Sequence, residues 1–156
     1  MHWGLWQAER PHGYLPLFAG DRLTNSPIMS KTFQILASLS ALLAVAFGAF
    51  GAHGLKGQLD EAAMAIYRTA VDYHMWHALG LGWIGLSLDR YPDSRLLRSA
   101  GWLMFAGILV FSGSLYALSL SGLRWLGMVT PLGGLSFMVA WGLVALALFR
   151  LDRNRR

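Results

Sequence analysis

The sequence predicts an all-α integral membrane protein, a four-helix bundle with a short interfacial helix between spans one and two. The first observation is composition, because 55% of the 156 residues are hydrophobic and only 13% are charged, about half the charged share of soluble domains. The second is a set of four long intervals almost free of charge. Such a chain is neither disordered, which requires low hydrophobicity and high charge, nor a soluble globule.

The intervals between charged residues mark the four spans. Residues 32–55, 99–123 and 125–149 contain no charged side chain, and 69–88 contain only Asp72. Each interval reaches the ~20 residues that cross a hydrocarbon core ~30 Å thick. The first span has an alternative interpretation as a cleaved signal peptide, because a basic residue precedes it and alanines lie near its end.

Regions outside the spans divide the chain further. Residues 1–28 hold three of the five prolines and no helical period, so we expect a flexible N-terminal extension before Met29, which looks like an ordinary start. The membrane domain is then 29–150, followed by a basic cytoplasmic tail at 151–156. The alternative for the extension is an interfacial anchor through its aromatic side chains: Trp3, Trp6, Tyr14 and Phe18.

The segment before span two predicts the interfacial helix. Asp60 and Glu61 would lie in its first turn, where acidic groups suit the helix dipole, and a bend is expected near 68–72. Apolar residues recur there at helical spacing: Leu59, Ala62, Ile66, Ala70 and Tyr73.

The basic residues predict the orientation. With four spans, both termini and the 89–98 loop share one side, which holds ten Lys and Arg against three on the other. This bias indicates an inner (plasma) membrane protein with both termini cytoplasmic. The same bias explains the net charge of +5, so no nucleic-acid partner is expected.

Three histidines form the candidate ligand or proton site. His53 ends span one, while His74 and His77 lie only 60° apart on span two, so all three are expected together in the outer leaflet. Tyr73 flanks them, and Tyr116 on span three reaches the same level. Ionisable groups inside a membrane are rare and mark functional sites by default.

The histidines have three interpretations. They could hydrogen-bond across helices and fix the packing, or form a proton-linked or small-molecule site, because imidazole titrates at about pH 6.5. The third is metal or haem ligation, for which two imidazoles in a chain without cysteine are a weak ligand set, so no metal site and no cofactor are expected. Asp72 is about 160° from His74 round the helix, which makes it a poor third ligand.

Small residues predict where the helices approach each other closely. Six glycines are expected at these contacts: Gly48, Gly51, Gly82, Gly85, Gly133 and Gly134.

Four blocks carry a resemblance to a known family: 47–55 (FGAFGAHGL), 73–79 (YHMWHAL), 111–116 (FSGSLY) and 130–134 (TPLGG). Together they resemble the YgdD-like family of small bacterial inner-membrane proteins, a domain of unknown function that is similar to a small eukaryotic transmembrane protein. The resemblance implies a four-helix membrane protein and carries over no activity, cofactor or catalytic residue.

Three functions remain open. We expect a non-enzymatic accessory or scaffold subunit, with the lipid bilayer and other membrane proteins or further copies of the chain as partners, because the chain has little mass outside its spans and no catalytic constellation. The alternatives are a proton-linked or small-molecule carrier that uses the histidines, and a haem- or quinone-associated redox partner.

Overall fold

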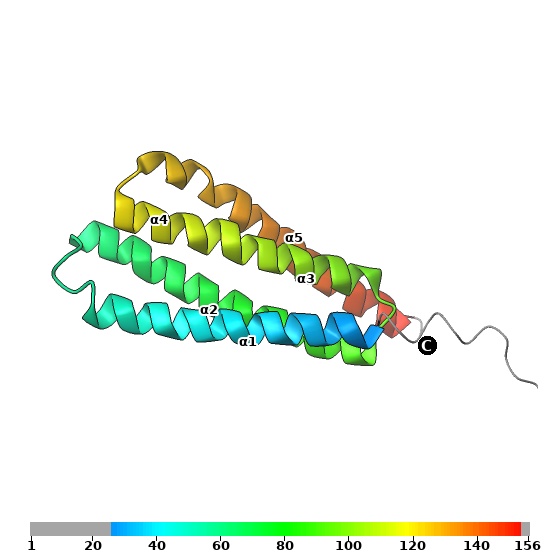
Figure 1. Ribbon diagram of the computed structural model, residues 1–156. Helices are drawn as coiled ribbons and strands as arrows, with labels where there is room; N and C mark the ends of the chain where they lie inside the picture. The colour runs from blue at the N-terminus through cyan, green and yellow to red at the C-terminus, as the bar shows by residue number, and fades with distance from the viewer. Residues whose placement is uncertain (1–25, 154–156) are drawn as a thin grey trace, which may run out of the picture.

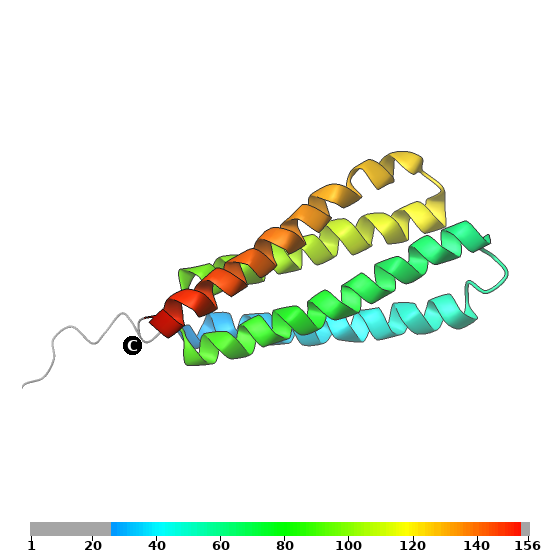
Figure 2. The same ribbon diagram turned by 180° about the vertical axis from the view of Figure 1, so that it is seen from behind.

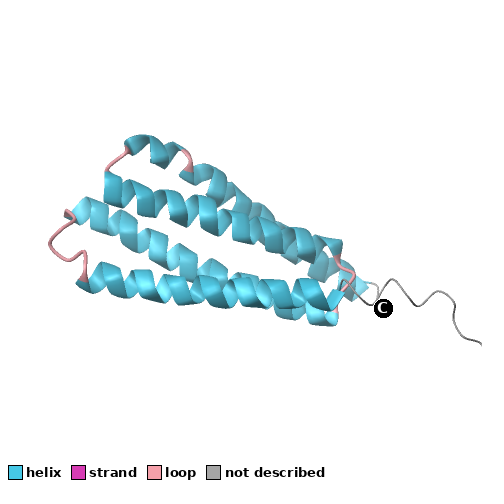
Figure 3. Cartoon of the chain, viewed as in Figure 1, coloured by secondary structure: helices cyan, strands magenta, loops and turns pink. Residues whose placement is uncertain are grey.

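The computed structural model describes residues 26–153, and within them the chain forms an antiparallel bundle of four helical rods without a strand (Figures 1 and 3). The predicted all-α four-helix bundle is confirmed. The third rod changes from α-helix to a π-turn and back, and a short 3-10 helix precedes the fourth. The elements are α1 (Ser26–His53), α2 (Glu61–Arg90), α3 (Arg95–Gly107), η1 (Ile108–Ser112), α4 (Gly113–Ser121), η2 (Arg124–Met128) and α5 (Thr130–Arg153).

Three helical segments in the described part of the chain are long and apolar enough to cross a membrane, namely Ile28–His53, Arg95–Ser121 and Arg124–Leu151. At 1.5 Å per residue their 26 to 28 residues extend about 40 Å. α2 has 30 residues and lies alongside them, but Arg68 and Asp72 make its first half more polar.

The interfacial helix expected between the first two spans is not a separate element. Asp60 caps α2 by accepting a hydrogen bond from the Ala63 amide at 2.7 Å, and from Glu61 the helix continues to Arg90 without interruption at 68–72. No proline lies in this helix and its first glycine is Gly80, so nothing in the sequence breaks the backbone where we expected a bend.

The first and last described helices extend beyond residues 29–150. α1 begins at Ser26, before Met29, and α5 continues to Arg153, beyond the expected bound at 150. Most of the predicted extension, including its four anchor aromatics, and the last three residues of the basic tail lie outside the described residues.

The core of the bundle lies where α2, α3 and α5 meet, and α1 packs on α2. Its largest fully buried apolar side chains include Phe33, Leu81, Ile84, Leu97 and Met104. The outer faces are apolar as well: Leu42, Met138 and Phe149 are 65–73% exposed. A monomer in water rarely exposes such a surface, whereas hydrocarbon covers it without cost.

The six glycines predicted at helix contacts lie on faces where helices meet. A Cβ atom would come 2.6 Å from the Tyr67 ring at Gly51 and 2.9 Å from Cγ of Gln34 at Gly85. At Gly133 it would overlap the facing backbone of η1, so only glycine lets α5 pack there. At the other three the contacts of a Cβ would be looser, with nearest atoms at 3.3, 3.4 and 3.6 Å: Gly48, Gly82 and Gly134.

Both ends of the described chain and the turn at 91–94 lie at one end of the bundle, and the turns after α1 and α4 lie at the other (Figures 1 and 2).

Candidate functional site

On one side of α2, His74 lies in an aromatic cluster that joins three helices. Its side chain is only 5% exposed, and its Nδ1 is 3.4 Å from the Tyr116 hydroxyl on α4. The Tyr116 ring packs edge-on against Phe47 of α1 and Tyr67 of α2, with centroids 4.9 and 5.2 Å away. Tyr67 donates a hydrogen bond to the Phe47 carbonyl at 2.9 Å. This cluster therefore links α1, α2 and α4 through aromatic contacts and one weak imidazole–phenol contact.

His77 faces a different set of helices. Its ring stacks on Phe137 of α5 with centroids 3.5 Å apart, and Tyr73 beside it stacks on Phe111 of η1 at 4.6 Å. Nδ1 of His77 donates to the Tyr73 carbonyl at 2.8 Å, because a carbonyl only accepts. That bond leaves Nε2 as the acceptor, so this imidazole is already fixed in orientation within its own helix.

His53 does not join either histidine. It is exposed at the last position of α1, and the contacts between α1 and α2, such as Gly48 with Val71, put it level with residue 66. His74 and His77 are then about 12 and 16 Å further along the axis at 1.5 Å per residue. The expected cluster of three is therefore wrong, because α2 begins at Glu61 and carries the other two to its middle rather than to the outer end.

Four of the five candidate residues form two pairs, one on each side of α2, and His53 lies apart from both. His74 pairs with Tyr116 and His77 with Tyr73. In the described part of the chain no group of three or more His, Cys, Asp or Glu side chains could hold a metal ion. A carrier that relies on all three histidines therefore has no common site in this geometry.

A cavity of about 330 Å³ lies next to His74, between α1 and the α3–η1–α4 rod. His74 and Tyr116 line it together with Ser40 and Ser112, and most of the remaining lining is aliphatic or aromatic. Leu43 and Leu109 at its edges are 48% and 59% exposed, so it opens sideways on the apolar surface. We call it the lateral cavity.

A polar contact at the opposite end of α2 was not expected from the sequence. Asp89 accepts hydrogen bonds from the Ser30 hydroxyl and from the Gln34 amide, the latter at 2.8 Å. These groups fix α1 against the last turns of α2. The signal in the sequence is a polar row on α1 at four-residue spacing, which includes Ser30 and Gln34.

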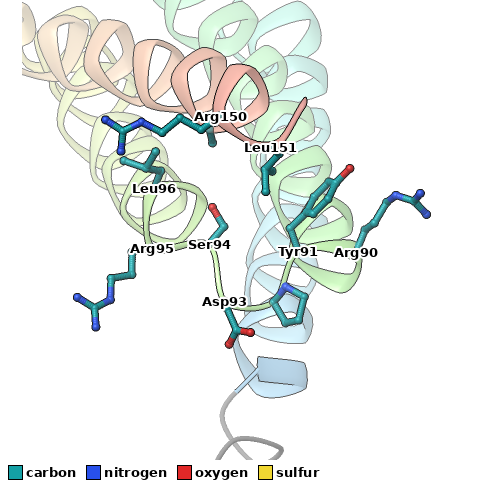
Figure 4. Close-up of a pocket in the computed structure, with 10 residues that line it drawn as sticks. Arg90, Tyr91, Asp93, Ser94, Arg95, Leu96, Arg150 and Leu151 are labelled. Atoms are coloured by element: carbon teal, nitrogen blue, oxygen red, sulfur yellow. The ribbon is translucent and has the colours of Figure 1, made fainter. Parts of the chain in front are cut away.

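Basic side chains surround a second cavity, of about 570 Å³, where the 91–94 turn meets the end of α5. Figure 4 shows the guanidinium groups of Arg90, Arg95 and Arg150 pointing outward in different directions from its rim. At this end of the bundle, positive charge lies where lipid head groups would surround a membrane protein.

Comparison with known proteins gives a consistent set of relatives. Residues 47–134 match the family described as "Protein of unknown function (DUF423)". The chain is 48% identical over 117 residues to the UPF0382 membrane protein YwdK of Bacillus subtilis, covering 75% of this chain and 95% of that protein. It is 47% identical over 117 residues to the UPF0382 membrane protein SERP0230 of Staphylococcus epidermidis, covering 75% of this chain and 94% of that protein. No solved structure matches the chain.

The matched segment begins and ends with the blocks that carried the resemblance. It starts at Phe47, the first residue of the first block, and ends at Gly134, the last residue of the fourth. The lateral cavity and both histidine pairs lie mainly within this segment.

Proposed function

The chain belongs to the DUF423 family of membrane proteins, and on this premise we propose that it acts without catalysis, as an accessory or scaffold subunit in the inner (plasma) membrane. Its partners in this proposal are transmembrane helices, either of other membrane proteins or of further copies of the chain. The four helical rods are joined by short segments, 54–60, 91–94 and 122–129, the last of which includes η2. These segments leave little room for an extramembrane catalytic site.

The observation that carries the proposal is a groove on the α1–α2 face lined by small side chains. The groove has a volume of about 460 Å³, and we call it the small-residue groove. In lipid, helices associate mainly through close van der Waals contact, so small residues at four-residue spacing favour the docking of another helix. The small side chains are Ala37, Ser38 and Ala41 of α1 with Ala78 and Gly82 of α2.

Large apolar side chains border the small-residue groove. Leu79, Trp83 and Leu86 follow one another along α2 and are 62%, 44% and 60% exposed. Trp83 also stacks against Trp141 of α5, with centroids 6.2 Å apart, which holds this edge in place. A small-residue floor beside a bulky edge gives a partner helix both close approach and a large contact area.

The proposed orientation rests on the charges at the two ends of the bundle. Within the described residues, the end of the bundle where Ser26 and Arg153 lie holds Lys31, Arg90, Arg95, Arg98, Arg150 and Arg153, against Lys56, Arg68 and Arg124 toward the other. Six against three favours a cytoplasmic location for the first end.

The test is extraction of the protein in a mild detergent, followed by mass determination and identification of bound proteins. Ser38→Leu places a large side chain in the small-residue groove, and we expect it to remove the partner or reduce the assembly to a single chain. Gly142→Leu is the matched control, because Gly142 is exposed on α5 and its Cβ would meet nothing within 4 Å. A wild-type protein that extracts as a single chain with lipid alone contradicts the proposal.

A further inference from the structure

Ser112 has a buried hydroxyl without a hydrogen-bond partner. The residue is 1% exposed, and its Oγ is the only buried side-chain polar atom without a partner in the described part of the chain. Serines in helices ordinarily bond to a carbonyl in the preceding turn, as Ser38 and Ser87 do here at 2.9 and 2.8 Å. The missing hydrogen bond of the Ser112 hydroxyl therefore reflects the position of Ser112 in its helix.

The π-turn η1 supplies the reason. Four residues before Ser112 is Ile108, whose carbonyl would be the usual acceptor. In η1 this carbonyl accepts the backbone amide of Gly113, five residues on, and the Ser112 hydroxyl makes no hydrogen bond to it. π-turns inside α-helices are frequent at functional sites. Here the wider turn leaves the Ser112 hydroxyl available to something other than its own helix.

Ser112 lines the lateral cavity together with Ser40, His74 and Tyr116. Every hydroxyl among them can donate a hydrogen bond, while the rest of the lining is mainly apolar. The exposed flanks at Leu43 and Leu109 open the cavity toward the hydrocarbon rather than toward an aqueous end. A molecule that enters the lateral cavity from the hydrocarbon is itself apolar. It meets hydrogen-bond donors only at the inner wall of the cavity.

We propose that the lateral cavity binds an apolar molecule dissolved in the bilayer through a carbonyl oxygen that accepts a hydrogen bond from Ser112. The tail of the molecule lies between Leu43 and Leu109 and its oxygen lies against η1. This site is separate from the small-residue groove, which lies on the other flank of α1, so it goes beyond the scaffold role and stands without it.

The probe is a long-chain methyl ketone that carries a photoreactive diazirine on its tail, added to the full chain in phosphatidylcholine nanodiscs. We expect labelled peptides to map to the walls of the lateral cavity, around Leu43 and Leu109. The unlabelled ketone should compete for labelling, while a straight-chain alkane of equal length should not. Loss of one hydrogen bond in Ser112→Ala should weaken competition by about tenfold.

A second variant separates binding from folding. Gly113 lines the cavity and a Cβ there would meet nothing within 4 Å, so Gly113→Leu should fill the cavity and abolish labelling while the helical circular dichroism signal stays the same. Gly142→Leu, on a face away from the cavity, should label like the wild type. The proposal is overturned if label spreads evenly over the lipid-facing residues, if the alkane competes as well as the ketone, or if Ser112→Ala binds the ketone with unchanged affinity.

Discussion

Removing the Ser112 hydroxyl should stabilise the bundle, which is the reverse of what a buried serine substitution usually does. An unpaired buried polar group costs about 1–3 kcal/mol, and the membrane reduces this because the unfolded state there also lacks water. We therefore expect Ser112→Ala to raise the free energy of unfolding by about 1 kcal/mol through this effect alone.

Ser114 is the matched control, two residues further along the same rod. It is also buried, at 8% exposure, but its hydroxyl hydrogen-bonds to the Thr130 hydroxyl at 2.8 Å and to the Phe111 carbonyl at 2.9 Å. Ser114→Ala should lower the free energy of unfolding by about 1 kcal/mol. The gain in helix propensity from Ser to Ala is common to both variants, so the difference of about 2 kcal/mol reports on the hydroxyl groups.

The assay is equilibrium unfolding in mixed micelles, followed by circular dichroism, with thermal melts in parallel. A difference of 2 kcal/mol corresponds to midpoints about 4–8 °C apart, with the Ser112 variant higher. If Ser112→Ala is destabilised as much as Ser114→Ala, the Ser112 hydroxyl has a partner such as a buried water, and η1 does not leave it unpaired.

Further predictions concern orientation, packing and the imidazole stack. Reporter fusions after Arg98 should read cytoplasmic and fusions after Arg124 extracytoplasmic, and the opposite pair of signals would invert the bundle. Gly133→Ala should reduce the yield of folded protein by costing about 2–3 kcal/mol through overlap with the η1 backbone, and an unchanged melt would show that α5 can shift there. His77→Phe should keep the stack on Phe137 and cost under about 1.5 kcal/mol, whereas His77→Ala should cost about 3 kcal/mol; equal melting of the two variants would contradict a packing role.

The sequence was sufficient for the fold because long charge-free intervals have one stable solution in a membrane. In hydrocarbon every backbone group must be paired internally, which leaves helices for spans of this length. The glycine positions were predictable for a related reason, since close approach of helices requires small residues. The sequence did not predict which element each glycine would contact. Gly133, for example, packs against η1.

The candidate site was less predictable because helical spacing predicts which residues share a helix face but not which other helices pack against that face. His74 and His77 are 60° apart, and that angle is enough to place one against α4 and the other against α5. His53 was misplaced because the start of span two was set by charge at Arg68, while the helix begins at Glu61. A charged residue indicates where the chain leaves the hydrocarbon, but a capped helix can begin several residues before that point.

The lateral cavity had no direct signal in the sequence. It depends on η1, whose changed hydrogen bonding leaves Ser112 without a carbonyl partner, and no residue type specifies a π-turn. Gly107 and Gly113 flank the turn, but both adopt right-handed helical angles that any residue can take. Beside the turn, Phe137 of α5 packs closely against Gly107, a tertiary contact that local sequence does not show.

If the small-residue groove holds a partner helix, photo-crosslinking from position 38 inside native membranes should capture that helix. A photoreactive amino acid at Ser38 should yield a defined protein adduct, either to a second copy of the chain or to another membrane protein. The same amino acid at Gly142 should yield lipid adducts alone. Lipid adducts alone from both positions would contradict a partner helix in the small-residue groove, because the groove would then face the bilayer as the rest of the exterior does.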